Sequence, residues 1–318
     1  MSLLARALGA SVVFGLVHAA ARAKATRLRS GPDRYPLDML VREPPGDEVW
    51  IDRPDGTRIR AVHRGEGPTI VLAHGYGISL LEWNVIWELL GDGARGPSRL
   101  IAFDQRGHGR STIGSDGIGT AAMVGDYRAV LERFDVKDAI LVGHSMGTFL
   151  SIAYLLDHPE HAREHLRGVV LISPTAGDVT RGAPQSRMQI PLIQSGFMAR
   201  IARSETYGVL FGASLMGDDP GPATIEAFNR VFLEQDHGKL VPILHALSGE
   251  SRYARLGEIQ MPCVVVCGEK DKTTPTWHAR RLGAEIPGAR NVWVPGKGHM
   301  LNWEAPEEIV RAIRSLQT

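Results

Sequence analysis

Short apolar runs alternate with segments of helical periodicity over most of the chain. Strand-like runs occur at residues 69–73 (TIVLA), 99–103 (RLIAF), 139–142 (AILV), 168–172 (GVVLI), 263–267 (CVVVC) and 291–294 (NVWV). Helical apolar spacing is found at residues 83–90, 121–134 and 145–158, and again after Thr276 and Pro306. Repeated strand–helix units of this kind predict a mostly parallel sheet that is covered by helices.

A hairpin is predicted before these units. The segments EVWIDR and RIRAVHRG alternate apolar and polar residues, and Asp55 and Gly56 between them form a turn signal. A proline-rich linker precedes the hairpin, with prolines at positions 32, 36, 44 and 45. With the six runs above, the hairpin completes an expected sheet of eight strands.

The pattern changes between residues 174 and 260. No strand-like run occurs there, and apolar residues such as Met188, Leu192 and Phe197 recur at helical spacing. We therefore expect a helical cap at 174–260, inserted into a core formed by 32–173 and 261–318. Because it leaves the core between two strands at their carboxyl edge, this cap is expected to roof a ligand site.

Residues 1–31 form a separate hydrophobic and basic segment. From Ala7 to Ala21 there is no Asp, Glu, Lys or Arg, and a basic cluster follows this stretch at Arg22, Lys24, Arg27 and Arg29. Three interpretations are open for residues 2–29: a membrane anchor or interfacial helix, a cleaved signal peptide, and a helix packed on the domain. The basic cluster favours membrane association with the domain on the cytoplasmic side over secretion.

Composition excludes several function classes. The chain has 318 residues, 43% of them hydrophobic, and a formal net charge of +1, so it can bury a large core and is no nucleic-acid binder by charge. Cys263 and Cys267 stand in one predicted strand, roughly 13 Å apart, too far for a disulfide. We expect two reduced core thiols, no structural zinc and no cofactor.

The pentapeptide GHSMG at residues 143–147 carries the first chemical signal. An apolar strand precedes it and a helical pattern follows it, which is the context of a G-x-S-x-G nucleophile turn. Gly143 and Gly147 suit the places where a Cβ atom would collide in such a turn. A serine hydroxyl at the tip, Ser145, still needs a base to become a nucleophile.

Two other loops supply an acid and a base. Asp271 follows the strand-like run CVVVC, and His299 follows NVWV, so both lie at the same sheet edge as Ser145 and in the chain order nucleophile, acid, base. Glu269 and Asp178 are conceivable substitutes for the acid. His74 and His108 are assigned to structure, the latter to bracing a tight loop.

The sequence resembles the α/β-hydrolase superfamily over residues 48–316. Within it, the chain is similar to capped serine hydrolases, which include esterases, monoacylglycerol-lipase-like enzymes, carbon–carbon bond hydrolases and cofactor-free haloperoxidases. The resemblance is carried by five motifs in order: VLAHGYG, AFDQRGHGRS, LVGHSMG, GEKDKTTP and GKGHMLNWEAPEEI. It implies an eight-stranded, mostly parallel sheet with helices on both faces and an inserted helical cap.

The resemblance also implies roles for individual residues. Ser145 would be the nucleophile, His299 the general base and then acid, and Asp271 the carboxylate that orients the imidazole. The backbone N–H groups of Tyr76 and Met146 would form the oxyanion hole. Thr148 departs from the family, because many relatives have glycine at this position, which bears on the packing behind the turn.

The leading hypothesis is hydrolysis of a small-molecule ester with an apolar acyl or alkyl part. A carbon–carbon bond hydrolase would need an arginine for its substrate carboxylate, and the cap offers Arg181, Arg187, Arg200 and Arg203. Perhydrolysis of the haloperoxidase type and a catalytically slow ligand receptor are further alternatives. Epoxide hydrolases and haloalkane dehalogenases are disfavoured, because they carry an aspartate at the position of Ser145.

Overall fold

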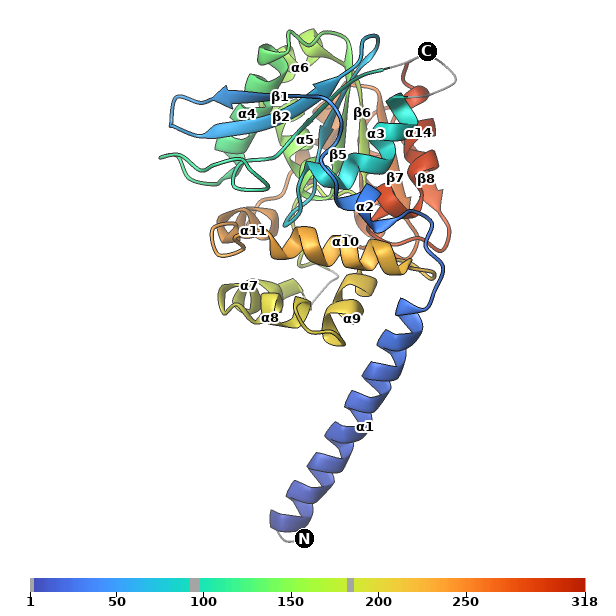
Figure 1. The fold of residues 1–318 in the computed structure, drawn as a ribbon. Coiled ribbons are helices and arrows are strands. Elements are labelled where there is room, and N and C mark those ends of the chain that lie inside the picture. The colour runs from blue at the N-terminus through green and yellow to red at the C-terminus, as the bar shows by residue number, and fades with distance from the viewer. Residues whose placement is uncertain (1–2, 92–97, 182–185, 318) are drawn as a thin grey trace.

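The computed structural model describes residues 3–91, 98–181 and 186–317, and within them the side chains other than those of 3–14, 186, 187 and 189. Its centre is an eight-stranded sheet with the strand order β1-β2-β4-β3-β5-β6-β7-β8 (Figure 1). The strands are β1 Asp47–Asp52, β2 Arg58–Arg64, β3 Thr69–Ala73, β4 Arg99–Phe103, β5 Ala139–His144, β6 Leu166–Ile172, β7 Cys263–Gly268 and β8 Arg290–Val294.

The predicted sheet is confirmed. Strands β3 to β8 run parallel to one another, whereas β1 and β2 form the expected antiparallel hairpin and β2 pairs antiparallel with β4. Every residue of β3, β5 and β7 is buried, because helices cover both faces of the sheet. This burial explains why these strands are continuous apolar runs. Cys263 and Cys267 are both free and buried within β7.

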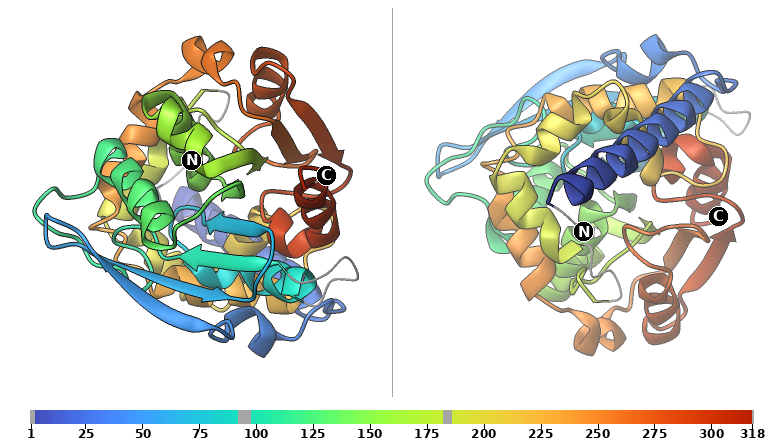
Figure 2. Two further views of the ribbon diagram at one scale, coloured as in Figure 1. Left: turned by 90° about the horizontal axis from the view of Figure 1, so that it is seen from above. Right: turned by 90° about the horizontal axis from the view of Figure 1, so that it is seen from below.

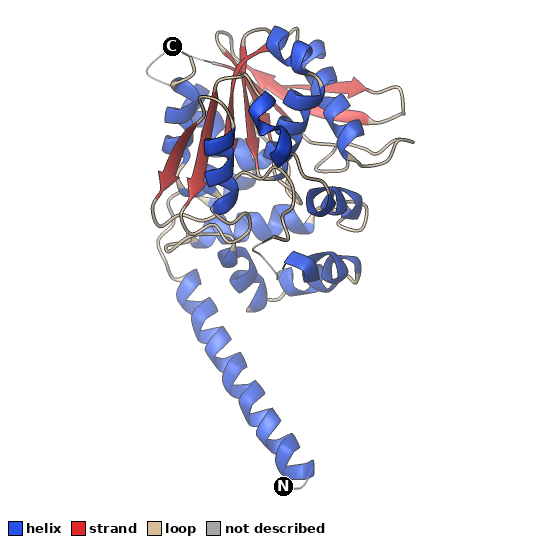
Figure 3. Ribbon diagram, turned by 180° about the vertical axis from the view of Figure 1, so that it is seen from behind, coloured by secondary structure: helices blue, strands red, loops and turns tan. Residues whose placement is uncertain are grey.

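Each face of the sheet has its own hydrophobic cluster and its own layer of helices (Figures 2 and 3). One layer contains α3 Asn84–Gly91 after a 3-10 turn, η1 Leu80–Trp83, together with α2 Leu37–Val41, α13 Leu301–Glu304 and α14 Pro306–Arg314. The other contains α4 Thr120–Arg133, α5 Met146–Asp157, α6 Pro159–His165 and α12 Trp277–Glu285. Helices therefore cover both faces of the mostly parallel sheet, as predicted.

Helices fill the chain between β6 and β7. They are α7 Ser186–Gln194, α8 Phe197–Ala202, α9 Tyr207–Ser214, α10 Pro222–Leu233, α11 Val241–Gly249 and the 3-10 helix η2 Tyr253–Glu258. In Figure 1, α10 and α11 lie between the sheet and a second layer formed by α7, α8 and α9. The two ends of this insertion are joined by hydrogen bonds from Asp178 N to Glu250 O and from Arg252 N to Ala176 O. The boundaries 174–260 of a separate cap stay a prediction.

Helix α1, Leu3–Arg29, extends away from the body (Figure 1), and its later part lies against α9. His18 Nδ1 and the Tyr207 hydroxyl share a hydrogen bond of 3.0 Å, and Ala25 is buried. Leu16 and Val17 are 67% and 59% exposed. Within the described ranges, no helix combines the length and apolar character needed to cross a membrane. Membrane association through residues 2–29 stays a prediction.

Candidate active site

Ser145 occupies a strained turn between β5 and α5. Its φ of 51° and ψ of −114° are unusual for a residue with a side chain, and its N–H donates to Ile172 O across the sheet edge. The flanking glycines are required by contact: a Cβ atom on Gly143 would lie 2.6 Å from Gly147 O, and one on Gly147 would lie 2.2 Å from Ala73 O. The chain thus packs closely enough to hold the Ser145 hydroxyl at the tip of the turn.

Ser145, His299 and Asp271 form a continuous hydrogen-bonded row. His299 Nε2 lies 3.0 Å from Ser145 Oγ, and His299 Nδ1 lies 2.9 Å from Asp271 Oδ2. When Nδ1 donates its proton to the carboxylate, Nε2 is left with the lone pair that accepts the serine proton. The three side chains predicted from separate loops are therefore brought together with the geometry of a nucleophile, a base and an orienting acid.

Asp271 is held as a carboxylate. Its Oδ1 accepts hydrogen bonds of 2.9 Å from the N–H groups of Thr273 and Thr274, and its Oδ2 accepts one of 2.9 Å from Thr274 Oγ1. Burial opposes its ionisation, but attraction to His299 and these hydrogen bonds keep the pKa of Asp271 below its usual 3.8. The alternative acids lie elsewhere: Glu269 is exposed, and Asp178 faces Arg181 at 3.9 Å.

The loop after β3 and the start of α5 offer two backbone donors. Tyr76 and Met146 both line the pocket that contains Ser145 and His299. Neither of their N–H groups donates to another atom among the hydrogen bonds of the described residues. Met146 is also the first residue of α5, where the helix dipole favours negative charge. These two donors fit the predicted oxyanion hole.

The pocket next to Ser145 is small and apolar. It is a cavity of about 130 Å³ between the sheet edge and the insertion. Three phenylalanines of the insertion form much of its wall, with the ring centroids of Phe211, Phe228 and Phe232 between 5.3 and 5.6 Å apart. Leu244 and Leu247 add aliphatic surface. The arrangement can hold an apolar group against the serine hydroxyl.

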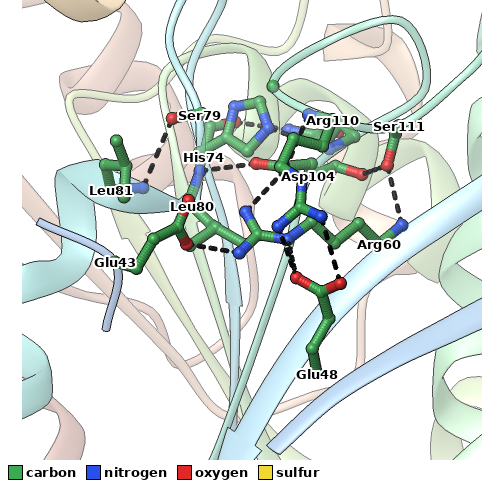
Figure 4. A network of polar contacts seen from close by, with 12 residues as sticks. Glu43, Glu48, Arg60, His74, Ser79, Leu80, Leu81, Asp104, Arg110 and Ser111 are labelled. Carbon is green, nitrogen blue, oxygen red and sulfur yellow. Dashed lines mark hydrogen bonds and ion pairs between the residues drawn. The ribbon is translucent and has the colours of Figure 1, made fainter. Parts of the chain in front are cut away.

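A buried polar network fixes the loop after β4 to its surroundings (Figure 4). Asp104, with no exposed surface, accepts hydrogen bonds from Leu80 N, Arg110 N and the Arg60 guanidinium, and Ser111 Oγ donates to its backbone carbonyl. Arg60 also pairs with Glu48, which in turn binds Arg110. The segment DQRGHGRS is thereby braced against the hairpin and against the start of η1.

His74 and His108 belong to this braced region. His74 Nε2 accepts a hydrogen bond of 2.8 Å from Gln105 N, which ties the loop after β3 to the loop after β4. His108 Nδ1 bonds the carbonyl of Arg106 at 3.1 Å. Burial lowers the pKa of His74 to about 3 and also lowers the pKa of His108, so both imidazoles are neutral near pH 7. These contacts agree with a structural assignment.

Thr148 fills the position where many relatives have glycine. Its Oγ1 donates to Ser145 O at 2.6 Å and accepts from Thr175 N at 3.0 Å. The hydroxyl therefore links the first turn of α5 to the loop after β6, and the packing behind the nucleophile turn accommodates it.

Two buried residues behind the turn, Glu82 and His144, share a hydrogen bond that the sequence analysis missed. Glu82 stands in an apolar segment and His144 occupies one of the two variable positions of the pentapeptide, so a single sequence carries no signal that pairs them. As to metals, no cluster of three or more His, Cys, Asp or Glu side chains suited to an ion occurs in the described part of the chain.

Comparisons with known proteins identify the family to which this fold belongs. The chain matches the model of the Alpha/beta hydrolase family over residues 70–312. It is 25% identical over 249 residues to the AB hydrolase superfamily protein YisY of Bacillus subtilis, covering 77% of this chain and 90% of that protein.

Among solved structures, an esterase from Exiguobacterium antarcticum shares the fold with a TM-score of 0.75 at 21% identity, covering 85% of this chain and 99% of that one. A bromoperoxidase from Bacillus anthracis does so with a TM-score of 0.73 at 19% identity, covering 85% and 99%. With the family match spanning most of the sheet and its surrounding loops, the chain belongs to the alpha/beta hydrolase family.

Proposed function

We propose that this chain is a serine hydrolase that cleaves carboxylic esters with a compact apolar acyl or alkyl part. The observation that carries the proposal is the 3.0 Å hydrogen bond between Ser145 Oγ and His299 Nε2, with buried Asp271 on the other imidazole nitrogen. The names of structural relatives, which include esterases, support the same class of reaction.

Acylation follows from this arrangement. The Ser145 hydroxyl attacks the ester carbonyl carbon while its proton passes to His299 Nε2, and the carbonyl oxygen becomes an oxyanion. The N–H groups of Tyr76 and Met146 donate to that oxyanion. The protonated imidazole, stabilised by Asp271, then donates its proton to the departing alkoxide, so the alcohol leaves and an acyl group stays on Ser145.

Deacylation repeats the sequence with water. His299 Nε2 accepts a proton from a water molecule as its oxygen attacks the acyl carbon, and the same backbone donors hold the second oxyanion. Collapse of this intermediate returns the proton to Ser145 Oγ and releases the carboxylic acid. No electron transfer is involved, and the enzyme ends in its starting protonation state.

The cavity limits the substrate. An engineered protein cavity of about 150 Å³ binds benzene, so a space of about 130 Å³ suits an apolar group of roughly four to six carbon atoms. Each methylene buried there contributes about 0.8 kcal/mol, which favours such groups over acetyl. Esters of short to medium acyl chains are therefore the proposed substrates.

Two alternative reactions would use the same three residues. A carboxylate-bearing substrate for carbon–carbon hydrolysis would need an arginine in the pocket, and no arginine lines it among the described side chains. Arg181, Arg200 and Arg203 are exposed instead, and the side chain of Arg187 lies outside the described residues. Perhydrolysis, suggested by the bromoperoxidase relative, would use hydrogen peroxide in place of water at the acyl-enzyme.

The test is hydrolysis of nitrophenyl esters from acetate to dodecanoate by the purified chain, with fluorophosphonate labelling of the active serine. We expect labelling at Ser145 and the highest kcat/KM near butanoate to hexanoate. Ser145→Ala should abolish both, and the exposed Ser115→Ala should change neither. Full turnover by Ser145→Ala would overturn the proposal, and absence of labelling in the unsubstituted chain would favour a ligand receptor.

A further inference from the structure

His144, the residue before the proposed nucleophile, binds two other parts of the site. Its Nδ1 lies 2.9 Å from Glu82 Oε2, and its Nε2 lies 3.0 Å from the backbone carbonyl oxygen of His299. The side chains of His144 and Glu82 are 1% and 0% exposed. Although His144 borders the pocket, both of its ring nitrogens are occupied by protein atoms, so it is not available to exchange a proton with substrate.

Glu82 extends this contact to the loop that carries the oxyanion donor. Its Oε1 accepts a hydrogen bond of 3.2 Å from Gly75 N, the residue before Tyr76. Its backbone carbonyl accepts one of 2.9 Å from Asn302 Nδ2, on the helix that follows His299. The pair therefore connects the oxyanion loop, the nucleophile turn and the loop of the base through buried hydrogen bonds.

The protons in the contacts between Glu82, His144 and the His299 carbonyl can be assigned. Because the His299 carbonyl only accepts, His144 Nε2 carries a hydrogen, and one further proton lies between Nδ1 and the Glu82 carboxylate. Burial raises the pKa of Glu82, and the Glu82 carboxylate, overcoming the desolvation of the imidazole, raises the pKa of His144. The pair keeps its shared proton, and as a unit it is neutral.

The oxyanion loop is also packed directly on this imidazole. A Cβ atom added to Gly75 would lie 3.0 Å from His144 Nδ1, closer than ordinary contact. The His299 carbonyl receives a second hydrogen bond of 2.7 Å from Ser173 Oγ, so its position is fixed by two donors. A shift of either segment would change the distance between the proposed base and the proposed oxyanion hole.

We propose that Glu82 and His144 are positioning residues that hold His299 and the Tyr76 N–H group at a fixed separation across the nucleophile turn. This inference rests on the proposed serine hydrolase function. Neither residue takes part in proton transfer, and their effect is expected on kcat, because a misplacement of about 1 Å at reacting groups can cost about 100-fold in rate.

The first test compares two amides at position 144. In His144→Gln the amide nitrogen falls near the former Nε2 and keeps the donor to His299 O, while Glu82 loses its partner. In His144→Asn the amide falls near the former Nδ1, which keeps the partner of Glu82 and loses the donor to His299 O. We expect both variants to lower kcat by up to about 100-fold with KM within twofold, because each breaks the connection between Glu82 and the His299 carbonyl at one end.

The second test concerns Glu82. Glu82→Met removes both hydrogen bonds at similar volume, whereas Glu82→Gln keeps an acceptor for Gly75 N and gains a donor for His144 Nδ1. We expect Glu82→Met to lower kcat by about 10- to 100-fold and Glu82→Gln to recover at least tenfold of that loss. The matched control is Asp126→Asn, a buried carboxylate that binds Arg53 and Arg106 and should change melting more than kcat.

All rates are expressed per serine labelled by fluorophosphonate, so that misfolded protein is not counted. The inference is overturned if either His144 variant, or Glu82→Met, keeps kcat within twofold of the unsubstituted chain. If the variants at one of these two positions do not fold, the variants at the other position test the inference. Lack of serine labelling in the unsubstituted chain would instead contradict the proposed function, so the two failures are distinct.

Discussion

His299 Nε2 lies 3.0 Å from Ser145 Oγ although the two residues are 154 positions apart in the sequence. The distance is short because β5, β7 and β8 run parallel, so the loops at their carboxyl ends emerge at one edge of the sheet. Asp271 follows β7 and reaches the far side of the same imidazole. The sheet thus sets the geometry on which the following predictions depend.

Asp271→Asn is expected to lower kcat by about 10³- to 10⁴-fold with little change in fold. An amide in place of the carboxylate can donate to His299 Nδ1, which would place the imidazole hydrogen on Nε2, the wrong nitrogen for accepting the serine proton. Steady-state kinetics on a nitrophenyl ester, with circular dichroism of the variant, measures this. A loss below tenfold would remove Asp271 from the mechanism, and Asp178→Asn then becomes the variant to assay.

Two substitutions in the pocket wall should move the acyl-chain preference in opposite directions. Phe228→Leu enlarges the cavity and Leu247→Phe reduces it, because both side chains line it. With about 0.8 kcal/mol for each buried methylene, kcat/KM should change by about fourfold for each carbon gained or lost. Profiles of kcat/KM against chain length measure the shift, and a common direction for both variants would contradict the assigned pocket.

Gly147→Ala is expected to destabilise the fold by more than about 3 kcal/mol. The added methyl group would lie 2.2 Å from Ala73 O and 2.9 Å from His74 O, so β3 and α5 would have to separate. Urea denaturation measures the loss. Gly249→Ala is the control, since its Cβ atom meets no other atom within 4 Å; similar stabilities for the two variants would show that the close contact is not limiting.

The stability advantage of the wild-type chain over Asp271→Asn should shrink as the pH falls from 5 to 3. Because the pKa of folded Asp271 lies below 3.8, its ionised form stabilises the fold above that pH. The contribution declines as the pH falls below 3.8, where the unfolded chain takes up the proton first, and it is lost once the folded state is protonated as well. Denaturation midpoints at several pH values test this. Asp116→Asn removes an exposed carboxylate and should show no such trend, and an advantage that grows in acid would contradict the assignment.

The sheet could be predicted from sequence because its central strands are buried on both faces. The run CVVVC is wholly apolar for this reason and forms β7 within one residue of its expected end. The short helix α2 was not predicted, since it lies in a proline-rich segment that reads as a linker. Leu40 in α2 is fully buried in the hydrophobic cluster on the α3 side of the sheet. Tertiary packing therefore determines that this segment is helical, whereas the local sequence pattern does not predict it.

Site residues could be predicted where each one stands in a recognisable local motif. Contacts between two residues that are distant in the sequence could not be predicted. Ser145 stands between glycines, and Asp271 and His299 follow strands. Glu82 and His144 are 62 positions apart, and only the folded chain brings them into contact. The same is true of Arg60 and Asp104, whose buried contact spans 44 positions.

The insertion between β6 and β7 provides most of the apolar wall around Ser145, whereas the proposed nucleophile, acid and base all belong to loops of the sheet. The residues proposed for reactivity and those of the apolar wall therefore come from different stretches of the chain, which meet where His299 N donates a hydrogen bond of 2.8 Å to Leu215 O. A laboratory lineage that diversifies only the wall residues of α10 and α11, and keeps the backbone contact at Leu215, is expected to reshape the cavity while it inherits the three proposed catalytic residues unaltered.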